Sequence, residues 1–252
     1  MSMTSTQLGK LLCDNFPHEH ESMTIGILGG IGPEASAYFY AELIRRLKKS
    51  GRIRTNADYP HIILNNINAP ELVTLDVTAD MLQPYVEGLK ELVEHEPDFI
   101  VMVCNTIHLF RKEFMEASAY ENIISLRDVI KEELGKCPDS LCILGTPATV
   151  GSGLFSFSGR SYQNPDEKDL GIIAEIVPRY NAKGFLIYDR DQLIDIMDKQ
   201  KTRGAQTFVA ACTEVSALLR GHRKHKVIDT LEILLEHVIK RIIDDPNIVS
   251  VV

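Results

Sequence analysis

The sequence predicts an α/β fold of two similar lobes, each a parallel sheet flanked by helices, with a pseudo-two-fold relation and a site between them. Short apolar runs alternate with amphipathic segments along the 252 residues, as expected for strands and helices that follow one another. The run at residues 99–103 is apolar without interruption, which is typical of a parallel strand covered on both faces. The pattern of the first half also recurs in the second.

The expected strands share a short apolar run that ends in glycine or in polar residues, and they lie at residues 24–28, 61–66, 99–103, 141–144, 172–178 and 207–211. The expected helices share apolar residues at helical spacing, and they lie at residues 33–49, 80–94, 111–115, 125–134, 191–201, 213–219 and 230–243. Pro33 opens the first of these helices and basic residues close it, as the helix dipole prefers.

Two pairs of similar stretches indicate a duplicated unit. The Ile-Leu-Gly sequence at residues 27–29 recurs at residues 143–145. Later in each half an apolar run ends in a cysteine, first Cys104 and then Cys212. Because both matches occur in the same order at similar but unequal offsets, we expect two similar lobes that differ by an insertion or deletion.

The predicted domain division has three parts. Residues 1–22 form an N-terminal extension, residues 23–137 together with 227–252 form the first lobe, and residues 138–226 form the second. The extension is mixed and polar, without a basic start followed by an apolar run, so a secretory signal is not expected.

The composition disfavours several functional classes. The formal net charge is -8, and an acidic surface repels phosphate backbones, so no nucleic-acid partner is expected. No stretch approaches the roughly 20 apolar residues of a membrane span, so no membrane partner is expected either. The five cysteines are odd in number and include no C-x-x-C pair, which argues against a disulfide framework or a metal site and favours a reducing cytoplasm.

Cys104 and Cys212 are the strongest candidates for chemistry. Each follows an expected parallel strand and precedes polar residues that open a helix. The carboxyl ends of parallel strands are where open α/β sheets build their sites. Backbone N–H groups at the start of a helix favour a thiolate or a bound carboxylate. We therefore expect both thiols at one site, and no chemistry at Cys13, Cys137 or Cys142.

Several stretches together resemble the aspartate/glutamate racemase superfamily, and its aspartate racemase branch most closely. They share glycines or one of the two cysteines, and they are Ile25-Gly-Ile-Leu-Gly-Gly-Ile-Gly-Pro-Glu-Ala35, Val103-Cys-Asn-Thr-Ile-His108, Leu144-Gly-Thr-Pro-Ala-Thr-Val150, Ala211-Cys-Thr-Glu-Val215 and Ile228-Asp-Thr230. The resemblance spans about residues 23 to 245.

The resemblance implies a racemase that uses no cofactor and acts on an amino acid, aspartate or glutamate first. One cysteine, as thiolate, removes the α-proton, and the other, as thiol, returns a proton to the opposite face. Such a site must stabilise a carbanion-like state with fixed dipoles and hold each sulfur against the carbon. The resemblance also implies a homodimer.

Further site residues are implied by the resemblance, each with a role. Asn105 and Thr106 bind the α-carboxylate or orient Cys104, and Thr213 does the same beside Cys212. Glu214 tunes Cys212 or holds the substrate ammonium. The remaining residues contact the carboxylate, let the backbone approach the ligand or line the pocket, and they are Thr146, Thr149, Gly29, Gly30, Asn65 and Asn66. His108 is either a proton donor or a packing residue.

The chain departs from the superfamily's pattern at two places. Many aspartate racemases carry an arginine after the second strand that binds a substrate carboxylate, whereas this chain has Glu71 after Pro70. A glutamate there would repel an acidic substrate if it faced the pocket, unless Arg52, Arg54 or Lys183 compensates. Residues 158–206 are also a shorter stretch than in typical relatives. A neutral amino acid or another 2-substituted acid is therefore an alternative substrate.

Three other functions compete with this interpretation. Residues 30–35 fit a loose G-x-G-x-x-A dinucleotide pattern, but the expected acidic residue after the second strand is missing. A second alternative keeps the superfamily but changes the reaction, as in hydantoin racemases, maleate isomerases and arylmalonate decarboxylases. A third is a non-catalytic protein that binds a small acid.

Overall fold

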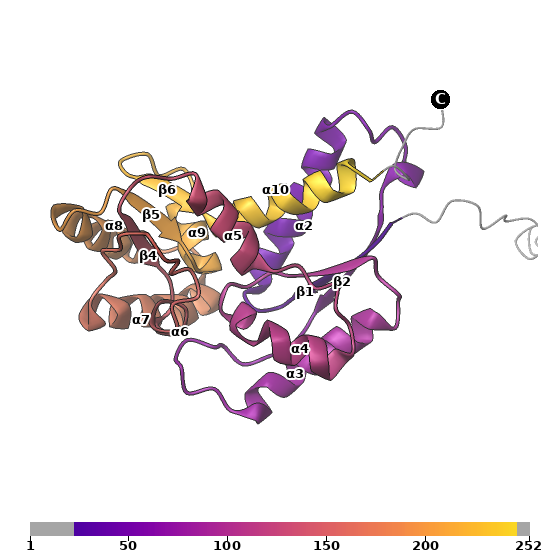
Figure 1. Cartoon of the computed structure of the whole chain (residues 1–252), viewed down its shortest axis with the longest axis horizontal. Helices are drawn as coiled ribbons and strands as arrows, with labels where there is room; N and C mark the ends of the chain where they lie inside the picture. Colours follow the sequence, from indigo (N-terminus) through magenta and orange to yellow (C-terminus); the bar gives the residue numbers. More distant parts are fainter. Residues whose placement is uncertain (1–22, 246–252) are drawn as a thin grey trace, which may run out of the picture.

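The computed structural model describes residues 23–245 and contains two parallel sheets of three strands each. The first sheet has the order β2-β1-β3 and the second the order β4-β5-β6. Helices flank both sheets (Figure 1), so the predicted α/β fold of two lobes is confirmed. The expected N-terminal extension, with Cys13, lies outside the described residues.

The first lobe is built on the central strand β1. Its strands are β1 (Thr24–Gly29), β2 (His61–Asn66) and β3 (Phe99–Met102). Its helical elements are α2 (Pro33–Lys49), η1 (Asn56–Asp58), α3 (Ala79–Val93), η2 (Thr106–Phe110), α4 (Arg111–Ser118) and α5 (Leu126–Gly135). All four residues of β3 are buried, as its uninterrupted apolar sequence predicts.

The second lobe is built on the central strand β5. Its strands are β4 (Leu141–Leu144), β5 (Thr207–Ala210) and β6 (Lys226–Asp229). Its helices are α6 (Pro147–Gly151), α7 (Glu167–Lys183), α8 (Ile187–Thr202) and α9 (Thr213–Leu219), after which α10 (Thr230–Ile243) follows β6. The residues of β4 and β5 are fully buried as well.

The two sheets have the same strand order once single bridges are included. Beside β3, Ile123 forms a parallel bridge with Ile100, in the place that β6 takes beside β5. Beside β4, Tyr162 forms a parallel bridge with Leu141, in the place that β2 takes beside β1. Strand β1 therefore corresponds to β4 and β3 to β5, which is the correspondence that the repeated stretches predict.

The strand expected at residues 172–178 is wrong, because this segment lies inside α7. Asp166 caps the helix by accepting a hydrogen bond from the Asp169 N–H at 3.1 Å. Ile173, Ile176, Val177 and Tyr180 are buried on one face, at the spacing of a helix. A short apolar run does not by itself distinguish a buried strand from a buried helix.

The lobes share a continuous apolar core. One buried cluster contains Ile25 and Phe39 of the first lobe together with Leu141 and Val209 of the second. Helix α10 packs on α2 and α5 of the first lobe, beside which it runs in Figure 1. Because β6 pairs with β5 through Asp229, the chain leaves the second sheet at Thr230 rather than at the expected residue 227. Within residues 23–245, no helix is long and apolar enough to cross a membrane.

Candidate active site

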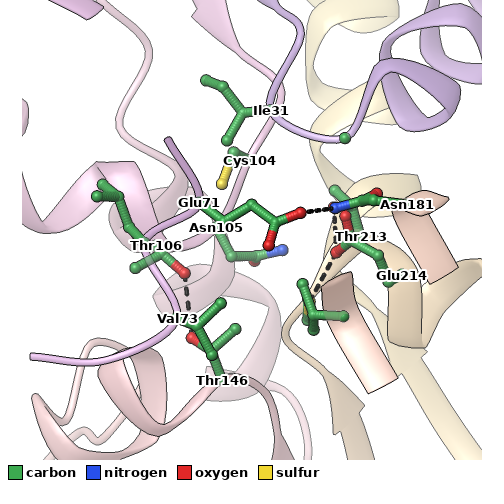
Figure 2. A pocket seen from close by; sticks show the side chains of 14 residues that line it. Ile31, Glu71, Val73, Cys104, Asn105, Thr106, Thr146, Asn181, Thr213 and Glu214 are labelled. Carbon is green, nitrogen blue, oxygen red and sulfur yellow. Dashed lines mark hydrogen bonds between the residues drawn. The ribbon is translucent and has the colours of Figure 1, made fainter. Parts of the chain in front are cut away.

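A pocket lies between the lobes, where the carboxyl ends of β3 and β5 meet. It holds about 370 Å³ of space, part of it open to solvent, which suits a small ligand. Figure 2 shows its polar side chains converging from both lobes. Its lining comprises Ile31, Gly32, Glu71, Leu72, Val73, Cys104, Asn105, Thr106, Thr146, Val177, Asn181, Cys212, Thr213 and Glu214.

Cys104 follows β3 by two residues and presents its partly exposed thiol to the pocket. Burial raises the pKa of this thiol to about 12, and the charge of Glu214 adds to the effect. Hydrogen bonds from the backbone N–H groups of Ile107 and Thr106 act in the opposite direction. Cys104 is therefore a protonated thiol at neutral pH, ready to donate a proton.

Cys212 occupies the corresponding place after β5, at the N-cap of α9. Its sulfur donates a hydrogen bond to the Glu214 carboxylate at 2.8 Å, and the Thr213 hydroxyl donates to the same oxygen at 2.9 Å. Burial and the charge of Glu214 raise the pKa of Cys212 well above its usual value. Burial also raises the pKa of Glu214. A thiol and a carboxylate that both bind protons tightly can exchange one between them.

Hydroxyl and amide groups form one wall of the pocket. The Thr106 hydroxyl lies 3.2 Å from that of Thr146 and 2.9 Å from that of Thr149. The Thr230 hydroxyl lies 2.8 Å from the side-chain oxygen of Asn105 and fixes this residue beside Cys104. Thr149 supports the cluster from behind, whereas Asn105, Thr106 and Thr146 line the pocket (Figure 2). These neutral groups can hold a carboxylate without a cation.

Comparison with known proteins decides the family. The model of the Asp/Glu/Hydantoin racemase family matches residues 28–238. The chain belongs to this family. Broad specificity amino-acid racemase RacX of Bacillus subtilis (strain 168) is 22% identical over 200 residues, covering 77% of this chain and 87% of RacX.

Solved structures of the racemase family share the fold. Picrophilus torridus aspartate racemase superposes with a TM-score of 0.69 at 22% identity, covering 87% of this chain and 94% of that one. Glutamate racemase from Francisella tularensis subsp. tularensis SCHU S4, in complex with D-glutamate, superposes with a TM-score of 0.66 at 14% identity, covering 92% and 85%. The resemblance to the aspartate/glutamate racemase superfamily is thereby confirmed.

Glu71 faces the pocket of this racemase family member. Its carboxylate accepts a hydrogen bond from the Asn181 amide at 2.7 Å, as Figure 2 shows. None of Arg52, Arg54 and Lys183, the basic residues that could have compensated for it, lines the pocket. Indeed, no Arg, Lys or His belongs to the lining formed by the described residues. The pocket thus carries two carboxylates and no basic side chain.

Five residues expected at the site do not line the pocket, namely Gly29, Gly30, Asn65, Asn66 and Thr149. The Asn65 amide donates to the Gly88 carbonyl at 3.0 Å and to Glu91 at 2.7 Å, so it faces α3. Asn66, the last residue of the edge strand β2, is exposed and does not line the pocket. Gly30 also lies outside the lining.

Gly30 serves the backbone rather than a ligand. Its φ is +93°, and a Cβ at this position would lie 2.1 Å from the Ile67 carbonyl oxygen. Its N–H donates to the Ser36 hydroxyl at 3.0 Å, and the nearby Pro33 has no N–H to offer. The turn after β1 is therefore not arranged to cradle a phosphate, which disfavours the dinucleotide-binding alternative.

His108 packs in the interior, which was one of its two expected roles. Its Nε2 lies 3.2 Å from the Met102 carbonyl, and its Nδ1 accepts from the Leu126 N–H at 3.4 Å. Burial lowers the pKa of this imidazole to about 4, so it is neutral at physiological pH. The two expected inert thiols within the described chain, Cys137 and Cys142, are buried outside the pocket.

Part of the lining comes from α7 and from loop residues that were not expected at the pocket. Asn181 and Val177 reach the pocket from α7, the segment in which a strand was expected. Ile31, Leu72 and Val73 supply the apolar wall from loops after β1 and β2. Only an amphipathic pattern over the whole of residues 167–183 would have indicated a helix there.

Proposed function

We propose that this chain is a cofactor-independent amino-acid racemase that uses Cys104 and Cys212 as its two acid–base groups. One observation carries the proposal: two thiols, each following the equivalent strand of its lobe, line the same pocket. A pair of thiols with carboxylate and hydroxyl neighbours suits proton transfer to and from one carbon.

The chemistry begins at Cys212, whose thiol proton moves to Glu214 along their 2.8 Å hydrogen bond. The resulting thiolate removes the α-proton of the amino acid, so that a C–H bond breaks and an S–H bond forms. Cys104 then gives its thiol proton to the opposite face of the carbon and is left as a thiolate. The configuration is inverted, and the reverse reaction starts from this state.

The neutral wall of the pocket supports binding of the α-carboxylate. The hydroxyls of Thr106 and Thr146 and the Asn105 amide line the same pocket as the thiols and offer donors to this carboxylate and to the negative charge that develops on it. Glu214 lies beside Cys212, where its carboxylate can attract the α-ammonium before it takes the Cys212 proton. A bound ammonium near both sulfurs lowers the pKa of each thiol and so favours the thiolate.

The test is exchange of the α-proton in deuterated water, followed by NMR over a panel of L- and D-amino acids. We expect at least one amino acid to lose its α-proton signal and its optical activity together. The reaction should proceed unchanged with EDTA and hydroxylamine, which remove metal ions and pyridoxal phosphate. No exchange with any member of the panel, despite measurable binding, would instead indicate the non-catalytic alternative.

A further inference from the structure

Provided that the proposed racemase function holds, we infer that the substrate carries a second cationic group, on its side chain, so that lysine or ornithine is its chemical class. This differs from the acidic amino acid that the resemblance implies. The inference rests on the charges that line the pocket, on their depth and on the apolar residues that line the same pocket.

Glu71 supplies the first part of the argument. It is exposed at the mouth of the pocket, and its hydrogen bond with Asn181 directs the carboxylate inward. Its charge also reaches Glu214, whose pKa it helps to raise. The two carboxylates therefore share one electrostatic environment, which attracts cations and repels a further carboxylate.

The basic residue of the neighbouring hollow contacts an aromatic ring rather than the pocket. Arg220 lines an adjacent hollow, where its guanidinium stacks 3.6 Å from the centre of the Tyr38 ring. Across the lining formed by residues 23–245 there is no guanidinium, ammonium or imidazole to pair with an acidic side chain. An aspartate substrate would bring its second carboxylate towards Glu71 without a counter-charge.

Two carboxylates at different depths suit two ammonium groups on one molecule. Glu214 is only 5% exposed and lies against Cys212, at the level of the reacting carbon. Glu71 lies at the rim, where the end of a long side chain would arrive. Ile31, Leu72 and Val73 line the same pocket and offer apolar contacts to the methylene groups of such a side chain. An α,ω-diamino acid matches this combination of two acidic groups and an apolar wall.

The experiment compares three substrates that differ at the end of the side chain: L-lysine, L-norleucine, which lacks the terminal ammonium, and L-aspartate. The readout is kcat/KM for α-proton exchange. We expect wild-type protein to prefer lysine to norleucine by roughly fivefold, the effect of a partly exposed ion pair, and to aspartate by more. Glu71→Gln keeps the amide partner of Asn181 and should lower the ratio of kcat/KM for lysine to kcat/KM for norleucine to about one. Glu71→Arg should reverse the order in favour of aspartate.

Glu94→Gln removes the same charge from an exposed site at the end of α3 and should leave all three rates unchanged. Norleucine exchange in each variant shows that the protein is folded. A wild-type preference for aspartate, or an unchanged lysine preference in Glu71→Gln, would overturn the inference while the racemase function stands. If no amino acid exchanges, the racemase function fails, and calorimetric binding of lysine against norleucine decides the inference: an affinity lost in Glu71→Gln supports it, and equal affinities contradict it.

Discussion

Replacing either Cys104 or Cys212 by serine is expected to lower kcat for racemisation by at least about 10³-fold. A serine hydroxyl is far less acidic than a thiol, so it can neither hold the negative charge nor give up its proton at neutral pH. Both sulfurs line the pocket at the ends of buried strands, and the substitution is nearly isosteric. The fold should therefore survive, as near-ultraviolet circular dichroism would show.

Each single variant should keep half of the chemistry. With Cys104→Ser, Cys212 can still remove and return the α-proton on its own side, so one enantiomer exchanges with deuterated water and the other does not. Cys212→Ser should show the opposite preference. Cys137→Ser is the matched control, because this thiol is buried outside the pocket. Racemisation at the normal rate in both active-site variants would exclude the two-thiol mechanism.

The substitution Glu214→Gln is expected to lower kcat/KM and at the same time to raise Tm. The amide cannot take the Cys212 proton, so kcat/KM at pH 7.5 should fall by about 10²-fold. Burial raises the pKa of Glu214 in the folded protein above its usual value of 4.5, so folded protein binds this proton more tightly than unfolded protein does. Stability is then lost as the pH rises through the folded-state pKa. The neutral amide avoids this loss and should raise Tm at pH 7.5, by about 2–4 °C per kcal/mol gained.

The pH dependence of kcat/KM distinguishes proton transfer through Glu214 from a purely structural role of this residue. In the wild type, kcat/KM should fall towards acid as Glu214 becomes protonated and can no longer accept the Cys212 proton. In Glu214→Gln, hydroxide must ionise a thiol of raised pKa, so kcat/KM should rise by about tenfold per pH unit through neutral and alkaline pH. The Tm advantage should vanish below about pH 4.5, where the carboxyl is protonated in both states. Parallel pH profiles for the two proteins would exclude proton transfer through Glu214.

The sheets and the cysteines could be predicted because their signals are local. Uninterrupted apolar runs give the buried strands β3 and β5, and parallel strands present their carboxyl ends at the same edge. Cys104 and Cys212 thus meet in one pocket although more than a hundred residues separate them. Because the pattern of the first half of the sequence recurs in the second, the similarity of the two lobes could also be predicted.

Other parts of the site depend on tertiary contacts that the sequence does not encode locally. Asn65 follows the same pattern of a polar residue at a strand end, yet its amide satisfies a carbonyl and a carboxylate of α3. Glu71 was noted as a departure, but only its contact with Asn181 places its carboxylate in the pocket. Asn181 lies on α7, beyond the end of the strand expected at residues 172–178, so the local sequence does not predict this contact.

The most direct test of two thiols acting on opposite faces is the position of deuterium early in the reaction. One enantiomer of the preferred amino acid is incubated in deuterated water to less than about one-tenth conversion. The two enantiomers are then separated, and the deuterium content of each is measured by mass spectrometry. Two separate acid–base groups predict a product that carries deuterium at the α-carbon, while the remaining substrate keeps its original hydrogen. Equal deuterium in substrate and product, or product that retains the substrate's hydrogen, would point to a single group serving both faces and contradict the mechanism.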